Sequence, residues 1–313
     1  DQQLNSVLLN RKVDADTKAD VMRRLIIRNE GSHKDSTIVI NLFDRIMEQE
    51  PDEAQLPMLY AQYLYSKNMV EKAIPVLQQT LQIEPTNTTA RMTLLGEAVK
   101  KEDYSSVIDI CQTGTEANPD MLEFYYYLAI GYNQTQRPDS VISVCQRALQ
   151  HVTEDSESNV VSDFYAILGD AYHTKNMMPE TYEAYEKALE YNSSNIMALN
   201  NYAYYLSLER RDLDRAEEMS YKTVKAEPNN ATYLDTYAWI LFEKANYEQA
   251  KLYIDQALLN DDSLSAEVLE HCGDIYFHTG DVDKAVEFWQ KAKENGSTST
   301  TLDRKIRQKK YIR

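Results

Sequence analysis

Apolar and polar residues along the chain follow a pattern that repeats every 34 residues. Pro51, Pro85 and Pro119 are 34 residues apart, and each directly follows the end of an apolar, helix-like segment. Proline cannot continue a helix, so these positions predict helix ends. Carried forward, the same frame gives eight units, which begin near residues 20, 54, 88, 122, 162, 196, 231 and 266.

Within the unit, small residues recur where two helices would approach closely, and large residues occupy the complementary positions. The eighth position is small in six units: Ala61, Ala129, Gly169, Ala203, Ala238 and Gly273. Small residues beside large ones at helical spacing let two helices pack at short distance. Each unit is therefore predicted to be one helix pair.

The frame shifts by six residues at the polar, acidic segment TEDSESN, residues 153–159. A polar insertion between two helix pairs is typical of a surface loop. We expect this segment to be the loop or hinge of the array and to exchange its amide hydrogens faster than the flanking helices.

Composition supports an all-α fold. The 313 residues include only eight glycines and eight prolines. Tight hairpins and phosphate-binding loops use glycine for its positive φ angles, so a β-sandwich, a barrel or a nucleotide-binding α/β fold would contain more of it.

The units resemble the tetratricopeptide repeat, a 34-residue helix–turn–helix motif. The segments that carry the resemblance are LEFYYYLAIGYNQTQRPDSVISVCQRAL from Leu122, DFYAILGDAYHTKNMMPETYEAYEKALEY from Asp163 and EVLEHCGDIYFHTGDVDKAVEFWQKA from Glu267. The resemblance covers residues 20–299 and is weakest in the unit at 20–53. It implies a right-handed α-α superhelix, a solenoid of about eight helix pairs, each burying its apolar face against its neighbours.

The two ends are expected to cap the solenoid. Residues 1–19 are predicted to form a leading helix, and TTLD, residues 300–303, is predicted as a capping box that opens a last helix. Residues 300–313 carry a net charge of +5, whereas the whole chain carries −17. This contrast suggests that the last helix covers an acidic surface, its own or a partner's; a solvated polar cap is the simpler alternative.

The charge and the motifs exclude several classes of function. A strongly acidic chain is poorly suited to nucleic acid or to an anionic membrane surface, and no apolar run is long enough to span a bilayer. Motifs for phosphate loops, serine hydrolases and zinc proteases are absent from the sequence. We therefore expect no enzyme activity, no cofactor and no metal site, and we expect the cysteines Cys111, Cys145 and Cys272 to be buried core residues.

In tetratricopeptide proteins the first helix of each unit lines the concave face, where its second, fifth, ninth, twelfth and thirteenth positions contact ligand. The resemblance therefore implies an acidic, aromatic face from the middle of the chain onward. The candidate residues are Tyr126, Asp163, Asp170, Tyr204, Asp235, Trp239, Phe242, Glu243, Glu270, Asp274 and Phe277. The fifth positions include no lysine, so the clamp that binds acidic chaperone tails is absent.

These residues predict a non-enzymatic scaffold that binds a basic or amphipathic protein segment, with aromatic rings supplying contact area and acids supplying attraction. The alternative for the aromatics is packing against the neighbouring unit. Two other functions stay open: the repeat portion of a larger envelope protein or enzyme, and a receptor for a glycan or small ligand. Similarity of residues 199–258 to bacterial repeat proteins, some lipid-anchored through a removed N-terminus, favours a location on the periplasmic side of a bacterial cell envelope.

Overall fold

The computed structural model describes residues 2–31, 35–261 and 263–313, and every regular element in these ranges is a helix. The chain divides into two compact units, residues 1–151 and 152–313. The boundary falls between the end of α9 at Gln150 and the start of α10 at Ser158, directly before the predicted loop at 153–159, whose last two residues belong to α10. The expected all-α class is confirmed.

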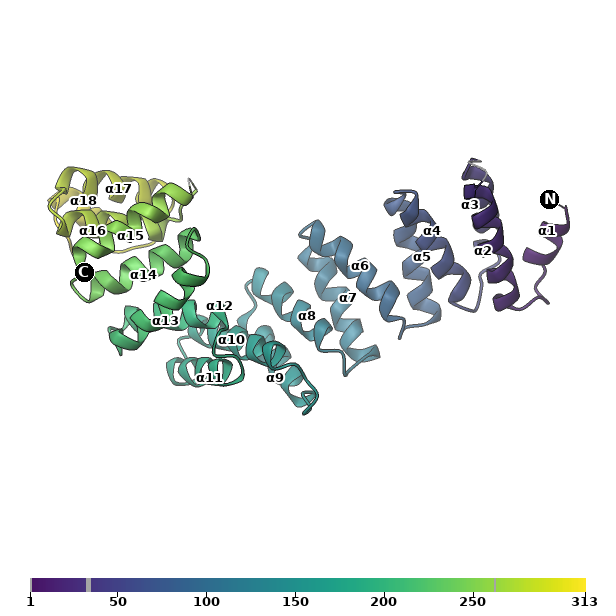
Figure 1. Cartoon of the computed structure of the whole chain (residues 1–313), viewed down its shortest axis with the longest axis horizontal. Helices are drawn as coiled ribbons and strands as arrows, with labels where there is room; N and C mark the ends of the chain where they lie inside the picture. The colour runs from purple at the N-terminus through teal and green to yellow at the C-terminus, as the bar shows by residue number, and fades with distance from the viewer. Residues whose placement is uncertain (1, 32–34, 262) are drawn as a thin grey trace. The chain divides into compact units, whose positions relative to one another are not determined.

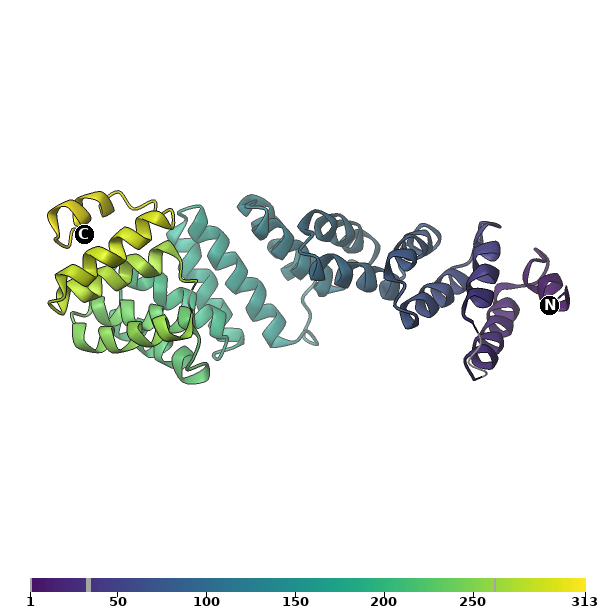
Figure 2. The same ribbon diagram turned by 90° about the horizontal axis from the view of Figure 1, so that it is seen from above.

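In each unit, consecutive helices lie side by side as pairs (Figures 1 and 2). The N-terminal unit contains α1 (Gln2–Leu8), α2 (Ala15–Gly31), α3 (Thr37–Met47), α4 (Gln55–Ser66), α5 (Val70–Ile83), α6 (Thr88–Lys100), α7 (Tyr104–Ala117), α8 (Leu122–Gln134) and α9 (Pro138–Gln150). The C-terminal unit contains α10 (Ser158–Thr174), α11 (Met178–Tyr191), α12 (Ile196–Leu208), α13 (Leu213–Ala226), α14 (Ala231–Glu243), α15 (Tyr247–Asn260), α16 (Ala266–His278), α17 (Val282–Glu294) and α18 (Leu302–Gln308).

The first helices of successive pairs also stack on one another. In the C-terminal unit these are α10, α12, α14 and α16, and each contacts the next. This stacking places the same repeat position of four helices along one surface. The candidate site is built on that surface.

The small-beside-large packing predicted from the sequence is present. A Cβ atom added at Gly273 would lie 2.3 Å from the indole of Trp289, which is fully buried. One added at Gly169 would lie 2.8 Å from the ring of Tyr185. Real Cβ atoms do not approach other atoms this closely, so these aromatic rings occupy the space that any larger residue would need.

The turn inside most helix pairs has the same geometry. One residue adopts positive φ, and the next residue donates its N–H to a carbonyl five positions earlier, which satisfies the end of the first helix. Met69 N, for example, lies 2.9 Å from Leu64 O. Only one of these turns uses glycine, at Gly280; the others use Asn68, Glu102, Gln136, Asn176, Arg210 and Ala245.

Both ends differ in detail from the expected pattern. The helix α2 begins at Ala15 because Asp14 caps it: the carboxylate accepts the Thr17 N–H and the Thr17 hydroxyl, each at 2.8 Å. At the other end α18 forms, but among the described residues the Thr301 side chain makes no capping hydrogen bond. Its hydroxyl instead lies 3.3 Å from that of Ser299, which donates to Glu270. The capping box predicted from Thr300 is therefore wrong in its position: the N-cap of α18 is Thr301, and its hydroxyl belongs to a tertiary network.

The three cysteines are free and fully buried, as expected. Burial raises the pKa of both Cys111 and Cys145 to about 12. No group of three or more histidine, cysteine or acidic residues is placed to hold a metal ion within residues 2–31, 35–261 and 263–313. No helix of the described ranges is long and apolar enough to cross a membrane.

Candidate functional site

The candidate site lies in the C-terminal unit, where α12, α14 and α16 present one face and the segment after α17 lies against it. Its central feature is Lys305, whose side chain is only 4% exposed. The Lys305 ammonium lies 2.8 Å from Glu270 Oε1 and 2.8 and 2.9 Å from the two oxygens of Asp274. Asp274 also accepts the indole N–H of Trp289 at 2.9 Å.

Burial and charge act in opposite directions on Asp274. Loss of solvent is the larger effect and raises the pKa of this carboxyl to about 6, although the Lys305 ammonium lowers it. Two buried carboxylates side by side would repel each other without a cation between them. Lys305 therefore offsets the repulsion between the carboxylates of Glu270 and Asp274.

Aromatic rings surround this charge cluster. Trp239 stacks on His271, with ring centroids 4.0 Å apart, and on Phe242, with centroids 4.8 Å apart. Tyr311 lies edge-on to Phe242 at 5.7 Å and to His278 at 4.7 Å. Because the rings stack on one another and are covered by Tyr311, they do not present open faces to a flat ligand.

A second charge pair lies deeper on the same face. Asp235 of α14 and His271 of α16 are both buried, and His271 Nδ1 lies 3.0 Å from Asp235 Oδ1. Burial lowers the pKa of His271, but the attraction of Asp235, together with Glu267 and Asp274, raises it overall. The exposed Glu267 accepts the hydroxyl of Tyr204, whose pKa burial raises.

Glu243, at the end of α14, is 7% exposed and holds two arginines. Arg210 Nε lies 3.1 Å from Glu243 Oε2, and Arg313 Nη2 lies 3.3 Å from the same oxygen. Arg313 is 70 residues away in sequence, so the end of the described chain returns to α14. Between these groups remains a cavity of about 280 Å³, lined by Tyr204, Leu208, Trp239, Glu243, Glu267, Glu270, His271, Asp274, Ser299, Thr301, Lys305, Tyr311 and Arg313.

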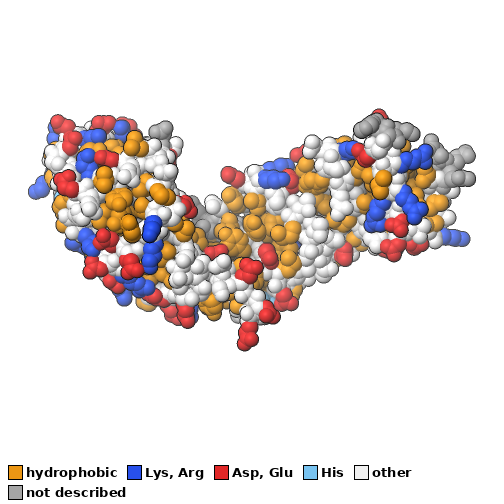
Figure 3. Space-filling view, viewed as in Figure 1, with side chains coloured by type: hydrophobic (Ala, Val, Ile, Leu, Met, Phe, Trp, Pro, Cys, Tyr) orange, Lys and Arg blue, Asp and Glu red, His pale blue; other side chains and the backbone are white. Residues whose placement is uncertain are grey.

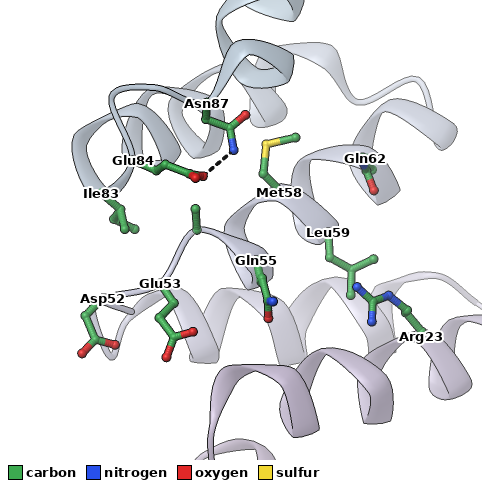
Figure 4. A pocket seen from close by; sticks show the side chains of 11 residues that line it. Arg23, Asp52, Glu53, Gln55, Met58, Leu59, Gln62, Ile83, Glu84 and Asn87 are labelled. Atoms are coloured by element: carbon green, nitrogen blue, oxygen red, sulfur yellow. Dashed lines mark hydrogen bonds between the residues drawn. The ribbon is translucent and has the colours of Figure 1, made fainter. Parts of the chain in front are cut away.

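The N-terminal unit has a cavity of its own, of about 520 Å³ (Figure 4). Gln55, Met58 and Gln62 of α4 line it, at the second, fifth and ninth positions of their unit. The Asn87 amide at the start of α6 donates to Glu84 at 2.7 Å on the opposite wall. Its charged side chains have both signs and are mostly solvated, so it has no buried charge cluster comparable to the one around Lys305.

Comparisons with known proteins place this geometry in a family. Two models of the tetratricopeptide repeat match the chain, at residues 162–195 and 238–300. The second match spans α15, α16 and α17 entirely. The chain contains tetratricopeptide repeats.

Several solved structures share the fold at low sequence identity. A tetratricopeptide repeat protein from Parabacteroides merdae is 13% identical with a TM-score of 0.58, over 82% of this chain and 98% of that one. PilF of Pseudomonas aeruginosa is 16% identical with a TM-score of 0.57, over 71% and 97%. A chain of the APC/C Cut9–Hcn1 hetero-tetramer is 13% identical with a TM-score of 0.63, over 94% and 55%. No curated protein sequence matches.

Within these tetratricopeptide repeats, the structure brings seven of the eleven predicted residues to one place. They are Tyr204, Asp235, Trp239, Phe242, Glu243, Glu270 and Asp274. Five of them, at 235, 239, 242, 243 and 274, are buried rather than solvated. In the view of Figure 3, acidic and basic side chains are mixed around hydrophobic ones over this unit, so the surface is not uniformly acidic.

The other predicted residues have different surroundings. Phe277 packs against Trp289, with centroids 6.0 Å apart. Asp163 accepts the amide of Asn195 at 2.8 Å, and burial raises its pKa. Tyr126 belongs to the N-terminal unit and lies edge-on to Tyr127.

Asp170 connects three helices of the same tetratricopeptide array. It accepts hydrogen bonds from the hydroxyl of Tyr185 and from Asn201 Nδ2, the latter at 3.0 Å, and Tyr205 lies 3.4 Å away. Burial raises the pKa of Asp170, and these donors oppose that shift. With its acceptor positions occupied, Asp170 stabilises the stack of α10, α11 and α12.

Sequence reasoning did not place His271, Tyr311 or Arg313 in the site. The available signal was the charge contrast between residues 300–313 and the rest of the chain, which suggested that the last helix covers an acidic surface. The structure assigns that surface to the chain itself, through Lys305 and Arg313.

Proposed function

We propose that this tetratricopeptide repeat protein is a non-enzymatic scaffold that binds a basic, amphipathic protein segment on the face of α12, α14 and α16. The observation that carries the proposal is that this face already holds a basic segment of its own chain. The acids at Glu243, Glu267 and Glu270 supply attraction, and Trp239 and Phe242 supply apolar area.

The chemistry of the face favours a protein segment over other ligands. A lysine or arginine side chain can pair with the acids while its methylene groups cover an aromatic ring. A sugar would need an open ring face, and the rings here stack on each other. The same face would serve equally if these repeats form part of a longer protein.

The test measures binding of synthetic peptides to the full chain by calorimetry. Three 12-residue peptides are compared: basic with aromatic residues, basic without them, and acidic with them. We expect the basic aromatic peptide to bind best and to weaken as salt rises from 50 to 500 mM, because ion pairs at a partly exposed rim are screened.

Matched variants distinguish binding at this face from a general effect of the protein's negative charge. Glu243→Gln and Glu267→Gln should weaken binding, whereas Glu248→Gln should not, because Glu248 lies exposed on α15 outside the cavity lining. Tighter binding of the acidic peptide, or an equal loss with Glu248→Gln, would contradict the proposal.

A further inference from the structure

The segment that follows α18 folds back over the binding face. The helix α18 ends at Gln308, the next residue, Lys309, has a left-handed φ of 47°, and the chain then reverses toward α16 and α14. Tyr311 reaches Phe242 and His278, and Arg313 reaches Glu243, 3.3 Å away. Residues 310–313 therefore cover part of the face that the proposed function assigns to a partner.

The two halves of the C-terminal segment are held differently. Leu302 and Lys305 are 2% and 3% exposed, and Leu302 is part of the hydrophobic core of the unit. After Lys309 there is no regular element; Tyr311 is half-buried, and the side chain of Arg313 is 58% exposed. An ion pair exposed to this degree contributes little to stability, so residues 310–313 can leave the face while α18 stays in place.

Lifting this segment would uncover a specific set of groups. Phe242 would lose the ring of Tyr311, and Glu243 would keep Arg210 but lose Arg313. Two residues of extended chain span about 6–7 Å, which lets one segment contact both groups with alternate side chains. The face therefore selects an aromatic side chain followed two residues later by an arginine.

We infer that residues 310–313 are a displaceable internal ligand and that the partner presents the same chemistry, an aromatic residue and an arginine two positions apart in an extended basic segment. This inference rests on the proposed function, because both use the face of α14 and α16. It adds that the partner must compete with the protein's own segment. Mutations that release the segment should therefore increase partner binding rather than weaken it.

The test uses the full chain and a fluorescein-labelled peptide of residues 308–313, QKKYIR, followed by fluorescence anisotropy. In the opened variant, Tyr311→Ala with Arg313→Ala, the peptide should bind at least tenfold more tightly than in the wild type. Lys310→Ala is the matched control: it removes one positive charge from the same segment at an exposed position and should leave affinity unchanged.

Two further changes locate the contact. Adding Glu243→Gln to the opened variant should reduce the gain, and a peptide whose arginine is replaced by glutamate should bind more weakly than QKKYIR. Circular dichroism verifies the fold; if the double variant is not folded, Arg313→Gln alone removes only the rim ion pair and serves instead.

The outcomes separate this inference from the proposed function. Equal affinity of wild type and opened variant would overturn the internal competition while leaving the binding face intact. An opened variant that binds other basic peptides but not QKKYIR would overturn the aromatic–arginine spacing. If no basic peptide binds either protein, the proposed function fails as well. Light scattering could show that the wild type forms dimers and that the opened variant does not. This result would mean that the segment binds a second copy of the chain, and it would overturn the proposed partner.

Discussion

Replacing Lys305 by methionine removes the only cation between Glu270 and Asp274 among the described residues. Methionine keeps the length and the apolar stem of lysine, so the change isolates the charge. Asp274 would keep the indole N–H of Trp289 as a donor at 2.9 Å, and Glu270 would keep the Ser299 hydroxyl at 2.9 Å.

The expected cost follows from burial. Both the Lys305 and the Asp274 side chains are 4% exposed, so the remaining carboxylate would be a buried charge without the ammonium group that balances it. Removing one member of a buried pair costs about 3–5 kcal/mol in the free energy of unfolding. We expect a loss in this range at pH 8, limited by the free energy needed to detach α18 alone.

The cost should shrink in acid. Burial raises the pKa of Asp274 to about 6 in the folded wild type, above its ordinary value of 3.8, and loss of Lys305 raises it further. A raised folded pKa contributes stability that is fully present below the unfolded pKa and is lost as pH rises through the folded pKa. Lowering the pH from 8 to 5 should therefore recover about 1.4 kcal/mol of the loss for each unit by which the pKa of Asp274 in the variant exceeds that in the wild type.

Urea unfolding followed by tryptophan fluorescence measures this effect. The two tryptophans, Trp239 and Trp289, both lie in the C-terminal unit, so the signal reports on that unit. Arg304→Met, at an exposed position of α18, is the control and should cost less than about 0.5 kcal/mol. Adding Asp274→Asn to Lys305→Met should restore part of the stability at pH 8. A loss below 1 kcal/mol, or one that is the same at pH 8 and pH 5, would refute the reasoning.

Three further predictions address the packing, the buried ion pair and the loop. Gly273→Ala should lower the free energy of unfolding by about 1–3 kcal/mol despite the better helix propensity of alanine, because the new Cβ would lie 2.3 Å from the Trp289 indole. Urea unfolding measures this loss, and adding Trp289→Phe should relieve the steric clash. Asp235→Asn should lower the pKa of His271, measured by NMR, because the burial that depresses it would remain while its main carboxylate is gone; an unchanged pKa would count against the pair. Amides of residues 152–157 should exchange faster than those of α9 and α10 by mass spectrometry, and uniform protection across that stretch would show the loop to be rigid.

The array of helix pairs was predictable because it depends on local spacing. Proline at helix ends and small residues opposite Trp289 or Tyr185 are constraints within one unit of 34 residues, and the sequence repeats them often enough to reveal the frame. The inner-face residues followed from the family resemblance once the frame was known. The burial of these residues could not be predicted in this way, because it depends on which other residues cover them.

The contacts that define the site could not be predicted, because they join residues that are far apart in the sequence. Lys305 meets Asp274 across 31 residues, and Arg313 meets Glu243 across 70. The second contact depends on a chain reversal at Lys309, a residue type that does not ordinarily mark a left-handed turn. The charge contrast indicated that an acidic surface was to be covered, but it could not select the residues.

The turns inside the helix pairs have a consequence for how such a protein diverges. At six of these turns the residue with positive φ is asparagine, glutamate, glutamine, arginine or alanine. A residue other than glycine pays a cost of order 1 kcal/mol to adopt this left-handed conformation. Two packed helices and a backbone hydrogen bond impose the turn, so its side chain is free to drift. Related proteins can therefore differ in residue type at these positions and still keep the same backbone turn.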